Sequence, residues 1–164
     1  MDAVDHEQLR RALDQHGSAL VLYAQQFCDT PEDVVQEAFV RLMRQKVAPE
    51  NVAGWLFRVV RNEAISASRA AARRSKHETQ AGKRKRAWFA AASDTRLDAD
   101  IATRALEELP PAQREILVAR VWGGLCFEDI ARLTGSSTST VHRQYQAGLE
   151  MLRKRLGVTC PRKN

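Results

Sequence analysis

Residues 127–149 read FEDIARLTGSSTSTVHRQYQAGL, a stretch that predicts two short helices joined by a turn. A helix-turn-helix needs a small residue where its helices nearly touch, a glycine that can adopt positive φ at the turn, and an apolar residue that inserts the second helix into the core. Ala131, Gly135 and Val141 occupy these places at steps of four and six residues. The stretch therefore predicts a helix-turn-helix within a helical fold.

The second helix of this motif has one apolar face and one polar face. Val141, Tyr145 and Leu149 recur at the spacing of a buried stripe that continues to Leu156. The opposite face presents hydrogen-bonding and cationic side chains: Ser139, His142, Arg143 and Gln146. Such groups can bond base edges or phosphates. DNA binding is the favoured interpretation, and an ordinary helical hairpin with a solvated polar face is the alternative.

Hydrophobic spacing also predicts helices in the first half of the chain. One amphipathic stripe consists of Leu9, Leu13, Leu20, Ala24 and Phe27. Thr30 and Pro31 then offer a hydroxyl N-cap and a proline at the first position of a second helix. Its expected buried face consists of Val34, Val35, Ala38, Phe39, Leu42 and Met43. A third helix is expected from about Trp55 to Arg74.

Further helices are expected over residues 101–109 and 112–122, and no strand-like alternation of useful length occurs. We therefore predict an all-α protein of two small helical domains, residues 1–76 and 98–164. Residues 77–97 lose the helical periodicity and are interpreted as a flexible basic linker.

Positive charge is concentrated in two blocks of a chain whose formal net charge is +6. Residues 69–86 hold eight basic side chains and one acidic side chain, and residues 137–164 hold six basic and one acidic. Two such blocks, each at the end of a helical pattern, indicate two contacts to a polyanion. The aromatic pair Trp88 and Phe89 lies beside the first block, and we expect these rings to dock against a surface.

Several classes of function are disfavoured. Cys28, Cys126 and Cys160 form no CxxC pair and have no histidine at ligand spacing, so neither a disulfide framework nor a metal site is expected. The sequence has no glycine-rich phosphate loop and no catalytic constellation, which argues against an enzyme, a cofactor or a small-molecule substrate. No apolar run is long enough to insert into a membrane, and the N-terminus is unlike a signal peptide. A cytoplasmic location is expected.

Three segments resemble a known family. Residues 31–42, PEDVVQEAFVRL, and residues 54–65, GWLFRVVRNEAI, resemble region two of bacterial RNA polymerase sigma factors of the sigma-70 family. Residues 105–117, ALEELPPAQREIL, followed by the helix-turn-helix, are similar to region four. The compact form resembles the extracytoplasmic-function (ECF) class. The resemblance implies a promoter-specificity subunit whose partners are core RNA polymerase and promoter DNA, and it leaves an anti-sigma factor open as a third partner.

The resemblance also implies three sets of contact residues. The second helix would bind polymerase through Asp33, Gln36, Glu37, Arg41 and Arg44. The third helix and the loop before it would bind the melted minus-ten element through Asn51, Trp55, Arg58, Arg61, Asn62 and Arg69. Trp55 as a core aromatic is the alternative for that residue. The recognition helix would read the minus-thirty-five element through Thr138, Ser139, His142, Arg143 and Gln146.

Three positions depart from the family pattern. Ser66 stands where an aspartate is common, and Gln144 and Ala147 stand where basic residues are often found. We therefore expect phosphate contacts in the second domain to depend on His142, Arg143 and the cluster of residues 153–155.

The sequence is also compatible with two other functions. A stand-alone helix-turn-helix regulator would bind a palindrome without polymerase, whereas a sigma factor would require core enzyme and an asymmetric promoter. An RNA-binding adaptor that uses residues 69–86 is a more distant alternative, which a strand-preference assay would test.

Overall fold

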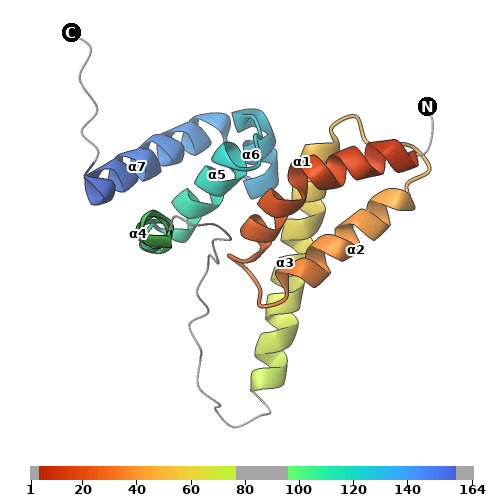
Figure 1. Ribbon diagram of the computed structural model, residues 1–164, viewed down its shortest axis with the longest axis horizontal. Helices are drawn as coiled ribbons and strands as arrows, with labels where there is room; N and C mark the ends of the chain where they lie inside the picture. The colour runs from red at the N-terminus through yellow and green to blue at the C-terminus, as the bar shows by residue number, and fades with distance from the viewer. Residues whose placement is uncertain (1–3, 77–95, 158–164) are drawn as a thin grey trace.

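A computed structural model describes residues 4–76 and 96–157, and in these residues seven helices and no strands occur (Figure 1). The helices are α1 (His6–Ala24), α2 (Pro31–Met43), α3 (Val52–Ser75), α4 (Arg96–Glu107), α5 (Pro111–Val121), α6 (Phe127–Thr134) and α7 (Thr138–Leu156). The all-α prediction is confirmed. The predicted linker, with its basic run and the Trp88-Phe89 pair, lies outside the described residues apart from the start of α4.

The first domain is a three-helix bundle whose helix starts follow from local chemistry. The Asp5 carboxylate accepts a hydrogen bond from the backbone N–H of Gln8, and the Gln8 Oε1 atom accepts one from the backbone N–H of Asp5, which forms a capping box at α1. Pro31 begins α2 as predicted, although the Thr30 side chain makes no capping hydrogen bond. The Asn51 Oδ1 atom accepts from the backbone N–H of Gly54 and caps α3.

The second domain contains the predicted helix-turn-helix, formed by α6 and α7. Gly135 ends α6 with φ of 68°, a left-handed conformation that favours glycine. Ser137 then caps α7 by accepting from the backbone N–H of Thr140. Val141 is fully buried and Ala131 nearly so, as the motif requires. The prediction made from the spacing of Ala131, Gly135 and Val141 is therefore confirmed.

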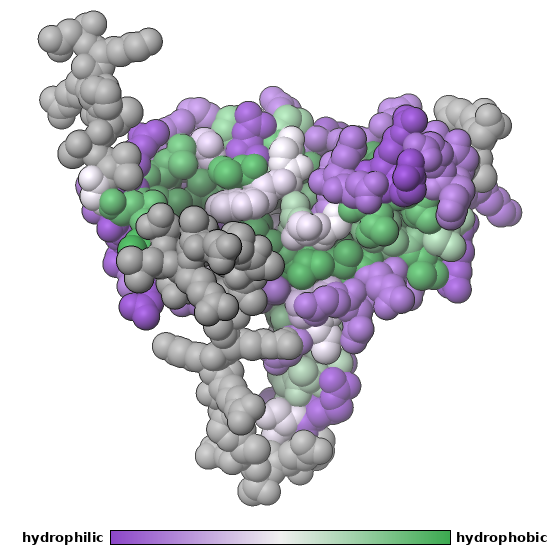
Figure 2. Space-filling model, in the orientation of Figure 1, coloured by the Kyte–Doolittle hydropathy of each residue, from purple (hydrophilic) through white to green (hydrophobic). Residues whose placement is uncertain are grey.

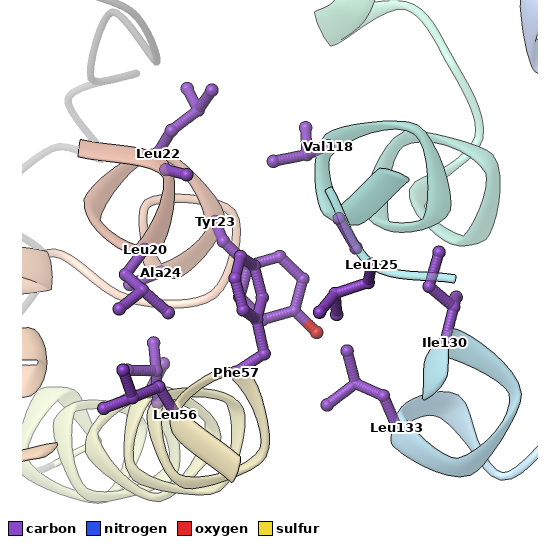
Figure 3. Close-up of a cluster of buried hydrophobic side chains, with 14 of the residues drawn as sticks. Leu20, Leu22, Tyr23, Ala24, Leu56, Phe57, Val118, Leu125, Ile130 and Leu133 are labelled. Carbon is purple, nitrogen blue, oxygen red and sulfur yellow. The ribbon is translucent and has the colours of Figure 1, made fainter. Parts of the chain in front are cut away.

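A single hydrophobic core joins the two domains. Figure 3 shows Tyr23 of α1 and Phe57 of α3 facing Val118, Leu125, Ile130 and Leu133 of the second domain. The Tyr23 and Phe57 rings pack edge to face with centroids 5.0 Å apart. Gly123 of the second domain lets the Phe57 ring pack against its backbone, because a Cβ atom at position 123 would lie 2.5 Å from Cζ of Phe57. The chain thus folds as two helical domains that share buried surface.

Three apolar residues differ from their predicted burial. Leu13, Met43 and Leu156 were expected on buried stripes but are 51%, 55% and 40% exposed. Met43 follows the fully buried Leu42 as the last residue of α2, so the covered side of the helix is at Leu42 and Met43 faces solvent. Leu156 is the last residue of α7, and residues 153–156 are all exposed. Leu13 lies on the exposed half of α1, where Ala12 takes the buried position. No described helix is long and apolar enough to span a bilayer.

Candidate functional site: three polar helix faces

The recognition helix α7 presents its predicted residues to solvent. The side chains of Thr138, Ser139, His142, Arg143 and Gln146 are all exposed. The opposite side of α7 packs on α5, where Gly148 lies against Leu117 so closely that a Cβ atom would be 2.8 Å from Cδ1 of the leucine. This fixed packing holds the exposed face in a defined orientation. The first turn of α7 contains no acidic residue, so its free backbone N–H groups can attract an anion.

Two of these residues have contacts that restrict them. The His142 ring packs edge to face on Phe127 with centroids 5.2 Å apart. The Ser139 hydroxyl lies 3.2 Å from that of Ser137, which is the α7 cap. Thr138, Arg143 and Gln146 are thus the predicted residues on this face with the most freedom to reach a base edge.

The basic cluster at the end of α7 is partly paired within the chain. The Lys154 ammonium lies 3.2 Å from the Glu150 carboxylate, and Arg155 pairs with Glu108. Both pairs are exposed, so each contributes little stability and can exchange for a phosphate partner. Gln144 is half-buried and Ala147 is exposed. Alanine at position 147 therefore leaves this surface without the positive charge that a basic residue there would supply.

The polar face of α2 is exposed at Asp33, Gln36, Arg41 and Arg44, and Glu37 is half-buried. Arg41 also links α2 to α3 through an ion pair, because its Nη1 lies 2.8 Å from the Glu63 carboxylate of α3. Its Nε donates a hydrogen bond to Glu37 within α2. These two carboxylates raise the pKa of Arg41 above its usual value. Figure 2 shows hydrophobic surface between α1 and α2, the helices that carry the exposed Leu13 and Met43. This region combines charged and apolar surface, a composition typical of a protein interface.

Ser66 lies beside this face. It lines a shallow hollow together with Asp33, Glu37 and Glu63. The aspartate common in the family would add a further carboxylate to three already present. With serine at position 66, the surface next to the Arg41–Glu63 ion pair carries one negative charge fewer than it would with aspartate.

Five of the six residues predicted for the minus-ten element share one face of α3. Steps of four, three, four and seven residues align Asn51, Trp55, Arg58, Asn62 and Arg69 along the helix. Arg58, Asn62 and Arg69 are exposed, as is Asn51 at the helix start. Trp55 is half-buried against the core, so it combines a core role with an accessible edge.

Arg61 is turned away from that face and into the contact between the domains. Its Nε donates to the Glu115 carboxylate over 2.7 Å, and the Tyr23 hydroxyl donates to the same oxygen over 2.7 Å. Burial and the Glu115 charge raise the pKa of Tyr23 well above its usual value. The bond to Glu115 raises the pKa of Arg61.

A second polar bridge between the domains is formed by Asn51. Its Nδ2 donates to the Asp129 carboxylate of α6 over 2.8 Å. Asp129 also accepts from Arg132 and from the thiol of Cys126, whose sulfur caps α6. Sequence reasoning missed Glu115 and Asp129, because each has the sequence context of an ordinary solvated carboxylate on a helix. In the described part of the chain, no group of three potential metal ligands occurs.

Comparisons with known proteins agree with this geometry. The family model for sigma-70 region 2 matches residues 13–74, and the model for sigma-70 region 4 matches residues 99–152. No curated protein sequence matches the chain.

Two solved structures are similar in fold. The sigma factor RpoE from Bartonella quintana, in complex with the anti-sigma factor NepR, is 24% identical with a TM-score of 0.74, over 94% of this chain and 99% of that one. CnrH, in complex with the cytosolic domain of CnrY, is 22% identical with a TM-score of 0.62, over 95% of this chain and 92% of that one.

Proposed function

The chain belongs to the sigma-70 family, and from this premise we propose which of its helix faces contact RNA polymerase and which contact the promoter. A sigma factor is the subunit that binds core RNA polymerase and directs it to specific promoters; it is a regulatory subunit and not an enzyme. The observation that carries the assignment is the presence of regions two and four, in order, in one chain whose three polar helix faces are accessible.

The polar face of α2 is proposed as the polymerase contact. Asp33, Gln36, Glu37, Arg41 and Arg44 form it. Mixed charges of this kind favour a specific, salt-sensitive protein contact. Arg41 and Glu37 act as a pair there, because the ion pairs of Arg41 with Glu37 and Glu63 fix both side chains before polymerase binds.

The exposed face of α3 is proposed to hold the melted minus-ten strand. Arg58, Asn62 and Arg69 follow one another along the helix, so cations can track a backbone while amides bond bases. Asn51 and Arg61 belong to this set once their carboxylate partners are displaced. The Trp55 edge supplies a ring for stacking.

The recognition helix α7 is proposed to read the minus-thirty-five element. Thr138, Arg143 and Gln146 are the base-reading candidates, and Ser139 and His142 are positioned for phosphate. The cluster at residues 153–155 adds charge to the same domain.

Four finer assignments accompany this function. We propose domain limits of residues 1–76 and 98–164, and the ECF class is supported by the match of regions two and four in order along the chain. A polymerase subunit acts in the cytoplasm. An anti-sigma factor is a further partner, an inference that is supported by the complexes in which RpoE and CnrH were solved.

Co-purification with core polymerase tests the α2 assignment. We expect Gln36→Ala combined with Glu37→Arg to abolish binding, because it removes an amide and reverses a charge in the centre of the face. Glu7→Arg on α1 is the matched control, since it reverses an exposed charge outside α2 and should leave binding unchanged. Far-ultraviolet circular dichroism checks that helix content is intact. Binding of the double variant at wild-type affinity would refute the assignment.

A further inference from the structure

An aromatic contact crosses the helix-turn-helix and reaches the exposed face of α7. Phe127, the first residue of α6, is half-buried. Its ring packs edge to face on His142 with centroids 5.2 Å apart, and on Tyr145 with centroids 5.3 Å apart. His142 and Tyr145 are three residues apart and therefore adjacent on α7. Because His142 is exposed and Tyr145 packs against the core, one ring of α6 touches both the recognition face and its buried support.

The guanidinium of Arg120 fixes the Phe127 ring in turn. Its Cζ atom lies over the ring, 4.8 Å from the centroid. Its Nη1 donates to the backbone carbonyl of Leu125 over 2.7 Å, so the same group is anchored to the turn that leads into α6. Leu125 is itself buried, and its backbone N–H donates to Ala119 of α5. The contacts therefore run from α5 through α6 to α7, three helices that pack on one another (Figure 1).

These contacts restrict the orientation of His142 before DNA arrives. A side chain that is already ordered loses less conformational entropy when it binds. A contact to phosphate fixes the register of a protein on the duplex without reading a base. The orientation of His142 consequently determines where α7 lies in the groove, and which base pairs Thr138, Arg143 and Gln146 meet.

We propose that Phe127 and Arg120 are positioning residues for promoter recognition, which hold the His142 ring and through it the register of α7 on the minus-thirty-five element. The inference rests on the assignment of α7 to that element made above. Phe127 lies on α6 and Arg120 on α5, so this role requires no contact of either with a base. Loss of the Phe127 ring should lower promoter affinity only while His142 is present, which separates positioning from a general loss of stability.

A double-mutant cycle on promoter binding tests the proposal. Holoenzyme is assembled from core polymerase and full-length chain, and fluorescence anisotropy measures its affinity for a labelled promoter fragment that gives a run-off transcript. Phe127→Leu removes the ring and keeps an apolar side chain, whereas Phe127→Tyr keeps the ring. His142→Ala removes the partner. Circular dichroism and thermal unfolding check that each variant is folded.

Phe27 offers a matched control in the first domain. It is also half-buried, its ring packs edge to face on Tyr23 with centroids 5.4 Å apart, and the Arg61 guanidinium lies over it at 5.9 Å. Phe27→Leu therefore removes the same kind of ring contact without touching α7. Any effect that it has on promoter affinity should add to that of His142→Ala.

We expect Phe127→Leu to weaken promoter binding about three- to ten-fold, and Phe127→Tyr to recover most of this loss. Once His142 is alanine, Phe127→Leu should have little further effect. Arg120→Lys keeps the charge and loses the planar fork, so it should weaken binding less and again only while His142 is present. In the nuclear magnetic resonance spectrum of the free chain, Phe127→Leu should shift the His142 ring protons, because the ring current of the neighbouring phenyl group is lost.

Three results would overturn the proposal in distinguishable ways. Additive effects of Phe127→Leu and His142→Ala would refute positioning and leave the assignment of α7 intact. An unchanged affinity for His142→Ala alone would refute positioning together with the DNA contact assigned to His142. A loss from Arg120→Lys that persists without His142 would refute the positioning role of Arg120 and indicate a direct phosphate contact instead.

Discussion

Removal of one hydroxyl group at Tyr23 tests the contact between the domains with the least disturbance. The Tyr23→Phe change keeps the ring that packs on Phe57 and deletes the donor that lies 2.7 Å from Glu115. A hydrogen bond to a charged group contributes about 1.5–3 kcal/mol, and because Arg61 still satisfies Glu115 we expect a loss of ~1–2 kcal/mol in the free energy of unfolding. The effect belongs to a bond between residues 92 positions apart, so local helix propensity does not contribute.

Urea denaturation followed by circular dichroism measures this loss. Tyr145→Phe is the matched control, since the second tyrosine of the chain is half-buried on α7, its ring packs on Phe127, and its hydroxyl makes no hydrogen bond with the described residues. A double-mutant cycle with Glu115→Gln should show that the two changes are not additive. A Tyr23→Phe effect no larger than that of Tyr145→Phe would refute the interdomain bond.

The pH dependence of the free energy of unfolding provides a second test of the buried Tyr23 hydroxyl. The pKa of Tyr23 is raised in the folded chain, so its stabilising contribution is complete below the ordinary value of 10.0 and is lost as pH rises above it. Wild type should therefore lose stability above that pH more steeply than Tyr23→Phe. If the unfolding free energies of wild type and Tyr23→Phe fell in parallel above that pH, the inference that the Tyr23 hydroxyl is buried beside Glu115 would be wrong.

Three other substitutions test the packing and the recognition helix. Gly123→Ala should destabilise the chain by about 1–3 kcal/mol in thermal or urea unfolding, because the new methyl group would lie 2.5 Å from both Phe57 and the Ala119 carbonyl. Gly17→Ala is its counterpart, since the nearest atom is at 3.5 Å inside α1, and it should stabilise by about 0.5–1 kcal/mol; a loss would argue against that helix register. Arg143→Ala should cost roughly 1–3 kcal/mol in promoter binding by the holoenzyme, measured by electrophoretic mobility shift, and unchanged affinity on every active promoter would contradict the placement of α7.

The helices and the turn motif could be predicted from the sequence because their determinants are local. Pro31 at the start of α2 and Gly135 at the end of α6 act within one helical turn, and Val141 is buried at the spacing that predicted it. The burial predicted for Met43 was wrong, because periodicity gives Leu42 and Met43 the same face while at the end of α2 only Leu42 is covered.

The contact between the domains could not be predicted in the same way. Glu115 lies in the second turn of α5 and has the sequence context of a solvated carboxylate, yet it is 8% exposed and accepts from Tyr23 and Arg61. Nothing near these residues in the chain indicates the partners, since those lie 92 and 54 positions away. The resemblance assigned Arg61 to the third helix, where it lies, and only the structure reveals Glu115 as its acceptor; its role at DNA stays a prediction.

Run-off transcription is the most direct test of the central claim, that this chain directs core RNA polymerase to specific promoters through both domains. Genomic fragments are transcribed with core polymerase alone, with core and wild-type chain, and with core and the Gln36→Ala/Glu37→Arg variant. The account predicts discrete transcripts from asymmetric promoters only when wild-type chain and core are both present. Footprinting of a palindrome by the chain alone, with no transcript added by it, would contradict the account and identify a stand-alone regulator.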